Sequence, residues 1–264
     1  MISFGGTDRK RMLHLLMSLL MLFLAAAFFT ACGKSDDGDE TEKNAVEGQK
    51  EYQDGIAAYE HQDYKAALKH FTKAAEYDNT DAMLMKSICL YSGKGTERDQ
   101  QAGLRLTKRA ADAGNPNAQA FYGHILTHTS RMSPEEKKKG VDYLEKSIAQ
   151  GCVFAMYTLG TYYGLNDDWD NEVKYLKMAA ELPLSTGTEK TFWDYYKNAW
   201  DNPSREEKDF SGVNYYIVLS QNTLGIFYED KMKDIDEARK WYRMAADNGY
   251  GSAQEELDYL DGKE

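Results

Sequence analysis

Residues 238–249 read ARKWYRMAADNG, and this stretch decides the fold. Trp241 stands four residues before Ala245, so a bulky and a small side chain share one helix face while Lys and Arg occupy the others. Gly249 is typical of a helix end, and another alanine, Ala253, follows at the start of the next segment. The stretch therefore predicts an amphipathic helix, a tight turn and a second helix.

The same pattern recurs along the chain at a nearly constant spacing. Alanine pairs begin at positions 74, 110 and 245, and each is followed by another alanine seven residues after its second member. A copy at 147 keeps only the gap, and a copy at 179 keeps only the pair. The steps between these positions are 36, 37, 32 and 66 residues, the last being twice 33. Such periods are typical of helix–turn–helix repeats that stack to bury their apolar faces. We predict an all-α fold, an α-solenoid of antiparallel helix pairs over residues 49–262.

Small and turn-forming residues recur at fixed places in the copies. Gly123, Gly160 and Gly225 stand at one register inside an expected helix, where glycine costs about 1 kcal/mol relative to alanine. Their repetition predicts a close crossing with a neighbouring helix. Asp81 and Asn117 end two of the turns, and we interpret them as N-caps of the helices that follow.

Together these residues resemble the Sel1-like repeat, a relative of the tetratricopeptide repeat. The copy at 238–249 carries that pattern most fully, and residues 91–99 (YSGKGTERD), 117–119 (NAQ) and 158–163 (TLGTYY) match other parts of it. The resemblance covers roughly residues 50–262. It implies a superhelix of helix pairs and adaptor work between proteins.

An export signal precedes the repeats. Basic residues at 9–11 are followed by an apolar run at 13–29, and small residues lead up to Cys32. This resembles the bacterial lipoprotein box, which implies a signal peptide at 1–31 and a lipid on Cys32. The alternative is an uncleaved anchor helix, because 17 apolar-rich residues are close to the minimum that spans a bilayer.

The residues after Cys32 bear on its location. Residues 32–48 are acidic and contain glycine, a composition that predicts a flexible tether. Gly33 stands where inner-membrane-retained lipoproteins of many bacteria carry aspartate, and Lys34 with the acidic pair at 36–37 resembles the surface-export signal of Bacteroidota lipoproteins. We expect a lipid-anchored protein of the bacterial outer membrane, on its periplasmic face or on the cell surface.

The chain is acidic, with a formal net charge of −11. Removing the leader leaves 29 basic and 42 acidic residues. This balance argues against nucleic acid and against anionic lipid surfaces as partners. It suits a protein or peptide partner, whose identity the sequence does not reveal.

Residues suited to chemistry are sparse. His124 and His128 are four residues apart and share a helix face, but no glutamate follows His124 and no third ligand is close in sequence. We therefore assign no metal, no cofactor and no catalytic residue. Cys89 falls at a core register and Cys152 in a turn two repeats along, so we predict two free thiols rather than a disulfide.

One copy departs from the regular spacing. After the pair at 179, the position of the downstream alanine is reached at Ser220, 33 residues late, which indicates an insertion at about 183–215. The insertion carries Trp193, Tyr195, Tyr196 and Trp200. Either these aromatics complete the core as a degenerate repeat, or they are exposed on the concave side as a ligand-binding site.

We interpret the protein as a non-catalytic interaction or scaffolding lipoprotein of the bacterial envelope, because stacked helix pairs create an extended binding surface. The alternative is a lipoprotein that captures carbohydrate or peptide for a nutrient-uptake system, with the inserted aromatics stacking on sugar rings. An enzyme is less favoured than either.

Overall fold

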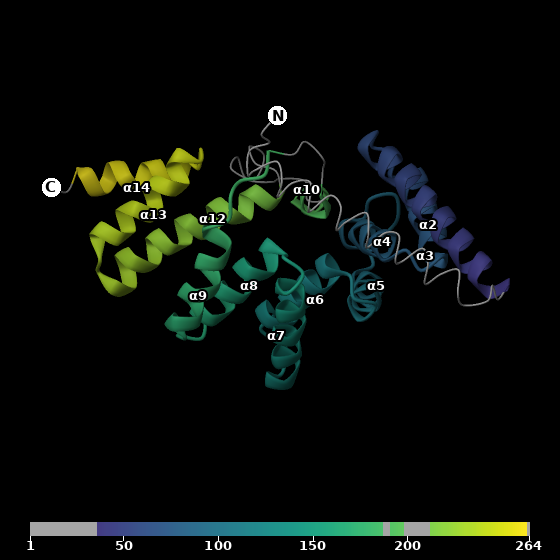
Figure 1. Cartoon of the computed structure of the whole chain (residues 1–264), viewed down its shortest axis with the longest axis horizontal. Coiled ribbons are helices and arrows are strands. Elements are labelled where there is room, and N and C mark those ends of the chain that lie inside the picture. The colour runs from purple at the N-terminus through teal and green to yellow at the C-terminus, as the bar shows by residue number, and fades with distance from the viewer. Residues whose placement is uncertain (1–35, 187–190, 198–211, 263–264) are drawn as a thin grey trace, which may run out of the picture. The chain divides into compact units, whose positions relative to one another are not determined.

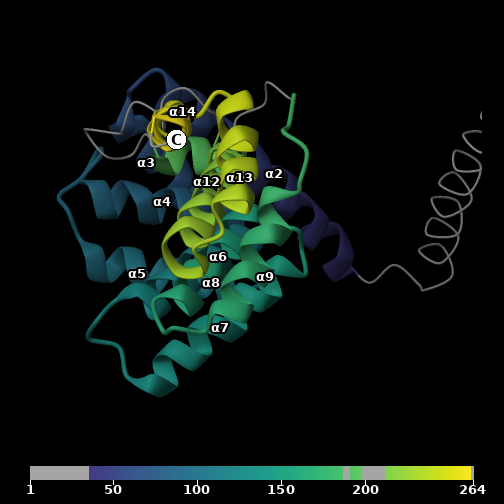
Figure 2. The ribbon, with the colours of Figure 1, turned by 90° about the vertical axis from the view of Figure 1, so that its left-hand side faces the viewer.

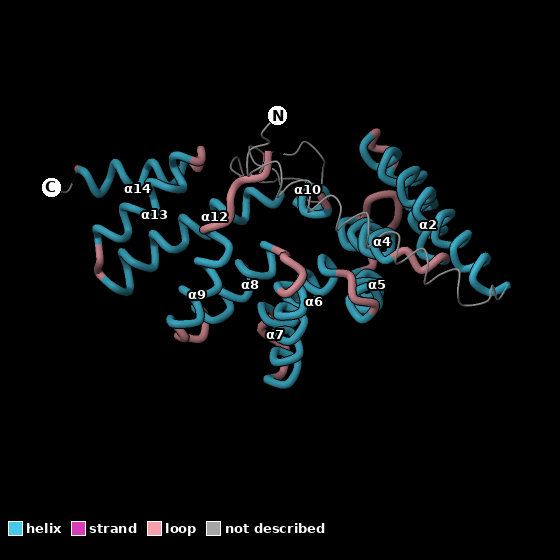
Figure 3. Tube along the Cα trace, in the orientation of Figure 1, coloured by secondary structure: helices cyan, strands magenta, loops and turns pink. Residues whose placement is uncertain are grey.

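Helices form all the regular structure of the described residues. The computed structural model describes residues 36–186, 191–197 and 212–262 (Figure 1), and these ranges contain no strand (Figure 3). The helices are α2 (Asp36–Glu60), α3 (Tyr64–Glu76), α4 (Thr80–Ser92), α5 (Gln100–Asp112), α6 (Pro116–His128), α7 (Pro134–Ile148), α8 (Val153–Gly164), α9 (Trp169–Ala180), α10 (Phe192–Lys197), α12 (Gly212–Phe227), the π-helical turn η1 (Tyr228–Met232), α13 (Ile235–Asp247) and α14 (Gly251–Asp261).

The chain divides into two units, Met1–Glu47 and Gly48–Glu264. The described part of the first unit, residues 36–47, is helical and begins α2. A flexible tether was expected over 32–48, but residues 40–47 are rich in Glu, Lys and Ala, which favour helix. The expected signal peptide at 1–31 and Cys32 lie outside the described residues. In the described part of the chain, no helix has both the length and the apolar character to cross a bilayer.

The second unit is a run of helix pairs, as predicted. Residues 48–60 of α2 pair with α3, and the later pairs are α4 with α5, α6 with α7, α8 with α9 and α12 with α13. The second helix of each pair packs on the first helix of the next pair, and α14 packs on α13. Figure 2 shows α12 and α13 lying side by side in this arrangement. The fold is therefore an α-solenoid.

The turns between pairs share one geometry. A backbone amide donates to the carbonyl five residues earlier in four of them: Asn79 to Ala74, Asn115 to Ala110, Cys152 to Ser147 and Tyr250 to Ala245. The next helix starts at once, and the side chains of Asn79 and Asn115 accept from its amides at 2.8 and 2.9 Å. The N-caps predicted at Asp81 and Asn117 are wrong by two residues, because the turn is tighter than the sequence suggested.

The glycines at the shared register lie where the two helices of a pair cross closely, as predicted. A Cβ atom at Gly123 would lie 2.8 Å from the carbonyl oxygen of Gly140 on α7, and one at Gly225 would lie 2.5 Å from the Tyr242 ring on α13. Gly160 meets α9 in the same way. These separations are shorter than van der Waals contact, so the close packing of each pair requires glycine.

Replacing Gly123 by alanine is expected to lower the free energy of unfolding by up to about 2 kcal/mol. Overpacking costs about 1–3 kcal/mol, and the better helix propensity of alanine returns about 1 kcal/mol of that. Gly251→Ala is the control, because a Cβ atom there meets nothing within 4 Å. Urea denaturation should separate the two variants, and equal stability would contradict the close-crossing explanation.

The insertion has the length that the repeat spacing predicts. Gln119 Nε2 donates to the carbonyl oxygen of Ala111, eight residues earlier. Gln221 Nε2 makes the equivalent bond to Ala180, 41 residues earlier. The difference of 33 residues lies between α9 and the repeat-like part of α12, and α10 is the described helix within it.

Both thiols of the described chain are free, as predicted. Cys89 and Cys152 are buried in the core and form no disulfide. Burial raises the pKa of the Cys89 thiol to about 12 and raises the pKa of Cys152 as well. At neutral pH both are therefore protonated and pack as small apolar side chains.

Candidate functional site

The short helix α10 packs on the first helices of the pairs. We call the surface formed by residues 48–60 of α2 and by α4, α6, α8 and α12 the first-helix face. The Trp193 ring lies 4.0 Å from the ring of Phe154 on α8 and 5.9 Å from that of Tyr216 on α12, measured between centroids. The Tyr195 ring lies 5.8 Å from that of Tyr59 on α2. Helix α10 therefore covers part of this face.

This packing bears on the two possibilities that the sequence left open for the inserted aromatics. Trp193 and Tyr195 are only 3% and 8% exposed, and Tyr196 is half-buried. Trp200 lies outside the described residues. An exposed strip at Trp193 and Tyr195 is thus wrong, and these two side chains complete the core, which is the other possibility that the sequence left open.

Backbone contacts hold α10 in place. The Asp194 carboxylate accepts from the amide of Gly212 at 2.6 Å and, at the other end of the turn, from the amide of Thr191 at 2.8 Å. A Cβ atom at Gly212 would lie 2.4 Å from the carbonyl carbon of Trp193. The start of α12 therefore approaches α10 too closely for a larger residue, and the sequence pattern contains no sign of this contact.

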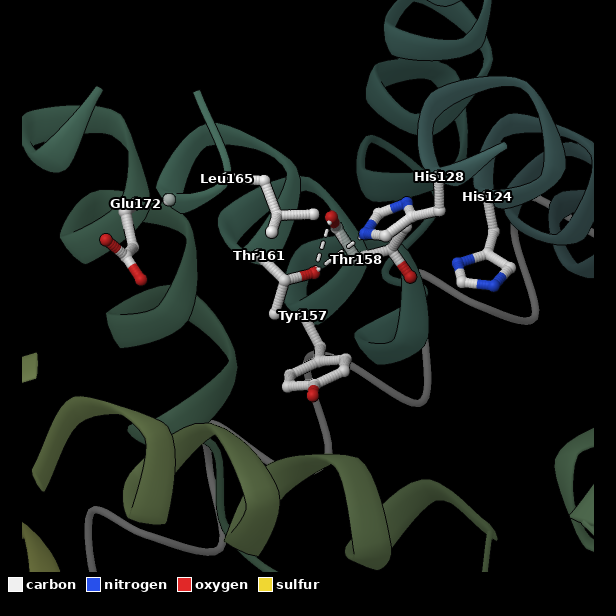
Figure 4. Close-up of a pocket in the computed structure, with 8 residues that line it drawn as sticks. His124, His128, Tyr157, Thr158, Thr161, Leu165 and Glu172 are labelled. Atoms are coloured by element: carbon white, nitrogen blue, oxygen red, sulfur yellow. Dashed lines mark hydrogen bonds between the residues drawn. The ribbon is translucent and has the colours of Figure 1, made fainter. Parts of the chain in front are cut away.

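A cavity of about 380 Å³ opens between α6, α8 and α9 (Figure 4). Its lining side chains are His124 and His128 from α6, Tyr157, Thr158 and Thr161 from α8, Leu165 just after α8, and Glu172 from α9. Phe154 connects it to α10, because its ring lies 5.5 Å from His124 and 4.0 Å from Trp193. The cavity is therefore next to the part of the solenoid that α10 covers.

The two histidines lie together, as their spacing predicts. Their rings stack with centroids 4.6 Å apart. His128 Nδ1 lies 2.9 Å from Thr127 Oγ1 and its Nε2 lies 3.2 Å from Thr161 Oγ1 (Figure 4), so both nitrogens already have hydroxyl partners. Burial lowers the pKa of His124 to about 4, helped by the proximity of His128, and burial also lowers the pKa of His128. Both rings are neutral at pH 7.

Three polar groups of the cavity have no partner among the described residues. Thr158 is 1% exposed, and its Oγ1 is shielded from solvent without a hydrogen bond. His124 Nδ1 is shielded in the same way. The half-buried Glu172 carboxylate forms no ion pair there, and burial raises its pKa. Buried polar atoms are nearly always bonded, so unbonded ones around a cavity indicate a place for a ligand.

A second group of ionisable side chains lies between α2 and α3. Glu51, Asp54 and His70 come close enough together to hold a cation. Both oxygens of Glu51 are already bonded, one to Lys73 Nζ at 2.5 Å and the other to His70 Nδ1 at 2.7 Å. These bonds, with Lys73 the larger contributor, lower the pKa of Glu51. The lysine supplies the positive charge, so we interpret this group as structural.

The repeat pattern and the stacked pairs are matched by a family of known proteins. The family model described as Sel1 repeat covers residues 48–77, 80–115, 116–152 and 219–250. The chain belongs to the Sel1 repeat family. The four matched repeats correspond to α2–α3, α4–α5, α6–α7 and α12–α13, while residues 153–218, with α8, α9 and the insertion, fall between them. The resemblance stated from the sequence is thus confirmed.

Individual relatives agree with this assignment. Two curated proteins named DAP3-binding cell death enhancer 1 are 29% identical to the chain, over 161 residues in Rattus norvegicus and 162 in Mus musculus. The matches cover 45% and 46% of this Sel1 repeat chain, and the chain spans only 31% of the length of either relative. The crystal structure of a Sel1 repeat protein from Oxalobacter formigenes superposes with a TM-score of 0.60 at 20% identity, covering 91% of this chain and 87% of that one. It shows the same fold.

Sequence reasoning found part of the candidate cavity. The spacing of His124 and His128 indicated a shared face, but Thr158 and Glu172 had no motif that singled them out. They come from the next pair, and only the stacking of α8 and α9 on α6 brings them to the histidines.

Proposed function

We propose that this Sel1 repeat protein is a non-catalytic scaffold of the bacterial envelope that binds another protein through the cavity at His124, Thr158 and Glu172. Sel1 repeat proteins generally mediate protein–protein interaction. We further propose that a lipid on Cys32 holds the chain at the outer membrane, on its periplasmic face or on the cell surface. The export signal at 1–31 supports this location.

The observation that carries the proposal is the set of unpaired polar groups around an open cavity. Desolvating Thr158 Oγ1 and His124 Nδ1 without a bond costs stability, about 1–3 kcal/mol for each such group. This loss of stability is offset when a partner supplies the missing hydrogen bonds.

The buried position of Trp193 and Tyr195 removes two of the four aromatics on which a sugar would stack, so we do not favour carbohydrate capture.

Photo-crosslinking in intact cells tests the proposal. A photoreactive residue replaces Leu165, which is 73% exposed at the rim of the cavity. The control position is Tyr259 on α14, which is 55% exposed. A partner that binds the cavity gives a discrete crosslinked product from position 165 and none from 259. The same products from both positions, or no product from 165, would overturn the proposal.

Replacing Cys32 by serine is expected to abolish lipid attachment and release the protein from the membrane fraction. Metabolic labelling with an alkyne-tagged palmitate, followed by fractionation, measures both effects. Cys152→Ala is the control, because that thiol is buried and should leave labelling unchanged. Continued labelling of the Cys32→Ser chain would show that the anchor is elsewhere.

A further inference from the structure

We propose that the cavity recognises a basic side chain, arginine or lysine, presented by the partner protein. This inference rests on the proposed function and names the chemistry of the partner. Three observations support it: the hydrogen-bonding groups that line the cavity, the position of the Glu172 carboxylate, and the absence of an ion pair between Glu172 and Lys231.

The free groups of the cavity can all accept hydrogen bonds. The Glu172 carboxylate is half-buried and is acceptor-only when ionised, whereas Thr158 Oγ1 and His124 Nδ1 have lone pairs but are shielded from solvent in this conformation. The two histidine rings are uncharged at pH 7, so they do not repel a cation. Figure 4 shows Glu172 at one end of the cavity and the histidines at the other, with Thr158 beside His128. A guanidinium with five N–H donors or an ammonium with three complements such a surface, whereas an anion does not.

The carboxylate is placed without a structural partner. Glu172 lies directly over Gly164, where a Cβ atom would come within 2.4 Å of its Oε1. The only cation acting on it is Lys231, among the residues that the structure describes, and the two form no ion pair. Lys231 Nζ instead lies 6.0 Å from the centroid of the Trp169 ring. A half-buried carboxylate without a counterion lowers stability, so a role in folding does not explain it.

The charge of the whole chain has the same sign. A net charge of −11 attracts basic partners over the range of the screening length and raises their association rate. The net charge does not determine where on the protein a basic side chain binds, whereas the Glu172 carboxylate in the cavity does. Replacing Glu172 by glutamine should therefore affect recognition while leaving the fold intact or slightly more stable.

Fluorescence anisotropy on the full chain in detergent tests this directly. The probes are labelled pentapeptides of sequence Gly-Ser-X-Ser-Gly, in which X is arginine, lysine, citrulline or glutamate. We expect the arginine and lysine peptides to bind. Citrulline, the neutral isostere of arginine, should bind at least about tenfold more weakly, because it lacks the positive charge that strengthens a hydrogen bond to a carboxylate. Glu172→Gln should reduce the affinity for arginine by a similar factor.

The control variant is Glu181→Gln, an exposed glutamate that follows α9 and should leave binding unchanged. Equal binding of the arginine and citrulline peptides, wild-type affinity in Glu172→Gln, or no saturable binding of the basic peptides would each overturn the inference. The crosslink from position 165 separates this failure from failure of the proposed function, since a partner that crosslinks there without needing Glu172 still uses the cavity.

Discussion

Replacing Trp193 by alanine is expected to lower the free energy of unfolding by about 3–5 kcal/mol, the range for a large aromatic removed from a core. The side chain is 3% exposed, and its ring packs on Phe154, Tyr216 and Phe192. The loss should reach across α8, α10 and α12, because the ring contacts all three. Urea denaturation followed by far-ultraviolet circular dichroism measures the change.

Trp169→Ala is the matched control, since this tryptophan is 41% exposed at the start of α9. We expect it to cost about 1 kcal/mol or less, in line with most surface substitutions. The opposite pattern would be a stable Trp193→Ala variant that no longer crosslinks to a partner. That result would return Trp193 to the role of a binding residue and contradict its assignment to the core.

The protein is expected to lose stability as the pH falls from about 6.5 to about 4, and His124 should account for about 3 kcal/mol of the loss. Burial, helped by His128, lowers the pKa of His124 from 6.5 to about 4 in the folded chain. Between pH 6.5 and about 4, His124 is therefore protonated in the unfolded chain and neutral in the folded chain, so acid favours unfolding. The contribution is fully present above pH 6.5 and is lost as the pH approaches 4, with each pKa unit corresponding to about 1.4 kcal/mol.

The urea midpoint measured between pH 7 and pH 4 tests this effect in wild type and His124→Gln. The wild-type curve should fall more steeply, because glutamine does not titrate. His128, whose pKa burial also lowers, and the carboxylates Glu51 and Asp112, whose pKa values are lowered by hydrogen bonds, stay in both chains and cancel in the difference. His61→Gln is the control, because His61 is exposed. Parallel curves for wild type and His124→Gln would contradict the assignment.

The repeat could be predicted from the sequence because its demands are local and recur. The Ala110 carbonyl accepts from the amide of Asn115 within a single turn. Gly123 permits the close crossing of α6 and α7 within a single helix pair. Similar constraints appear in each copy, so the spacing alone gives the fold and the length of the insertion. The N-caps are Asn79 and Asn115, two residues before the predicted positions, because the turn closes within five residues of the preceding helix.

The positions of α10 and of the candidate cavity could not be predicted in this way. Trp193 meets Phe154 across 39 positions of the chain, and Tyr195 Oη donates to Glu60 across 135. No periodic pattern specifies contacts of this kind, because aromatic residues have the same helical spacing whether the helix face that carries them is buried or exposed. The desolvation of Glu172 likewise depends on how α9 packs beside α8.

The sequence by itself determined that helix pairs stack, where their turns fall, and where 33 residues were added. Tertiary structure alone decided that Trp193 and Tyr195 are buried and that His124, Thr158 and Glu172 line one cavity. The physical reason is the range of the interactions. Helix periodicity and turn chemistry act between neighbours in the chain, whereas burial and unpaired polar groups exist only after distant helices have packed.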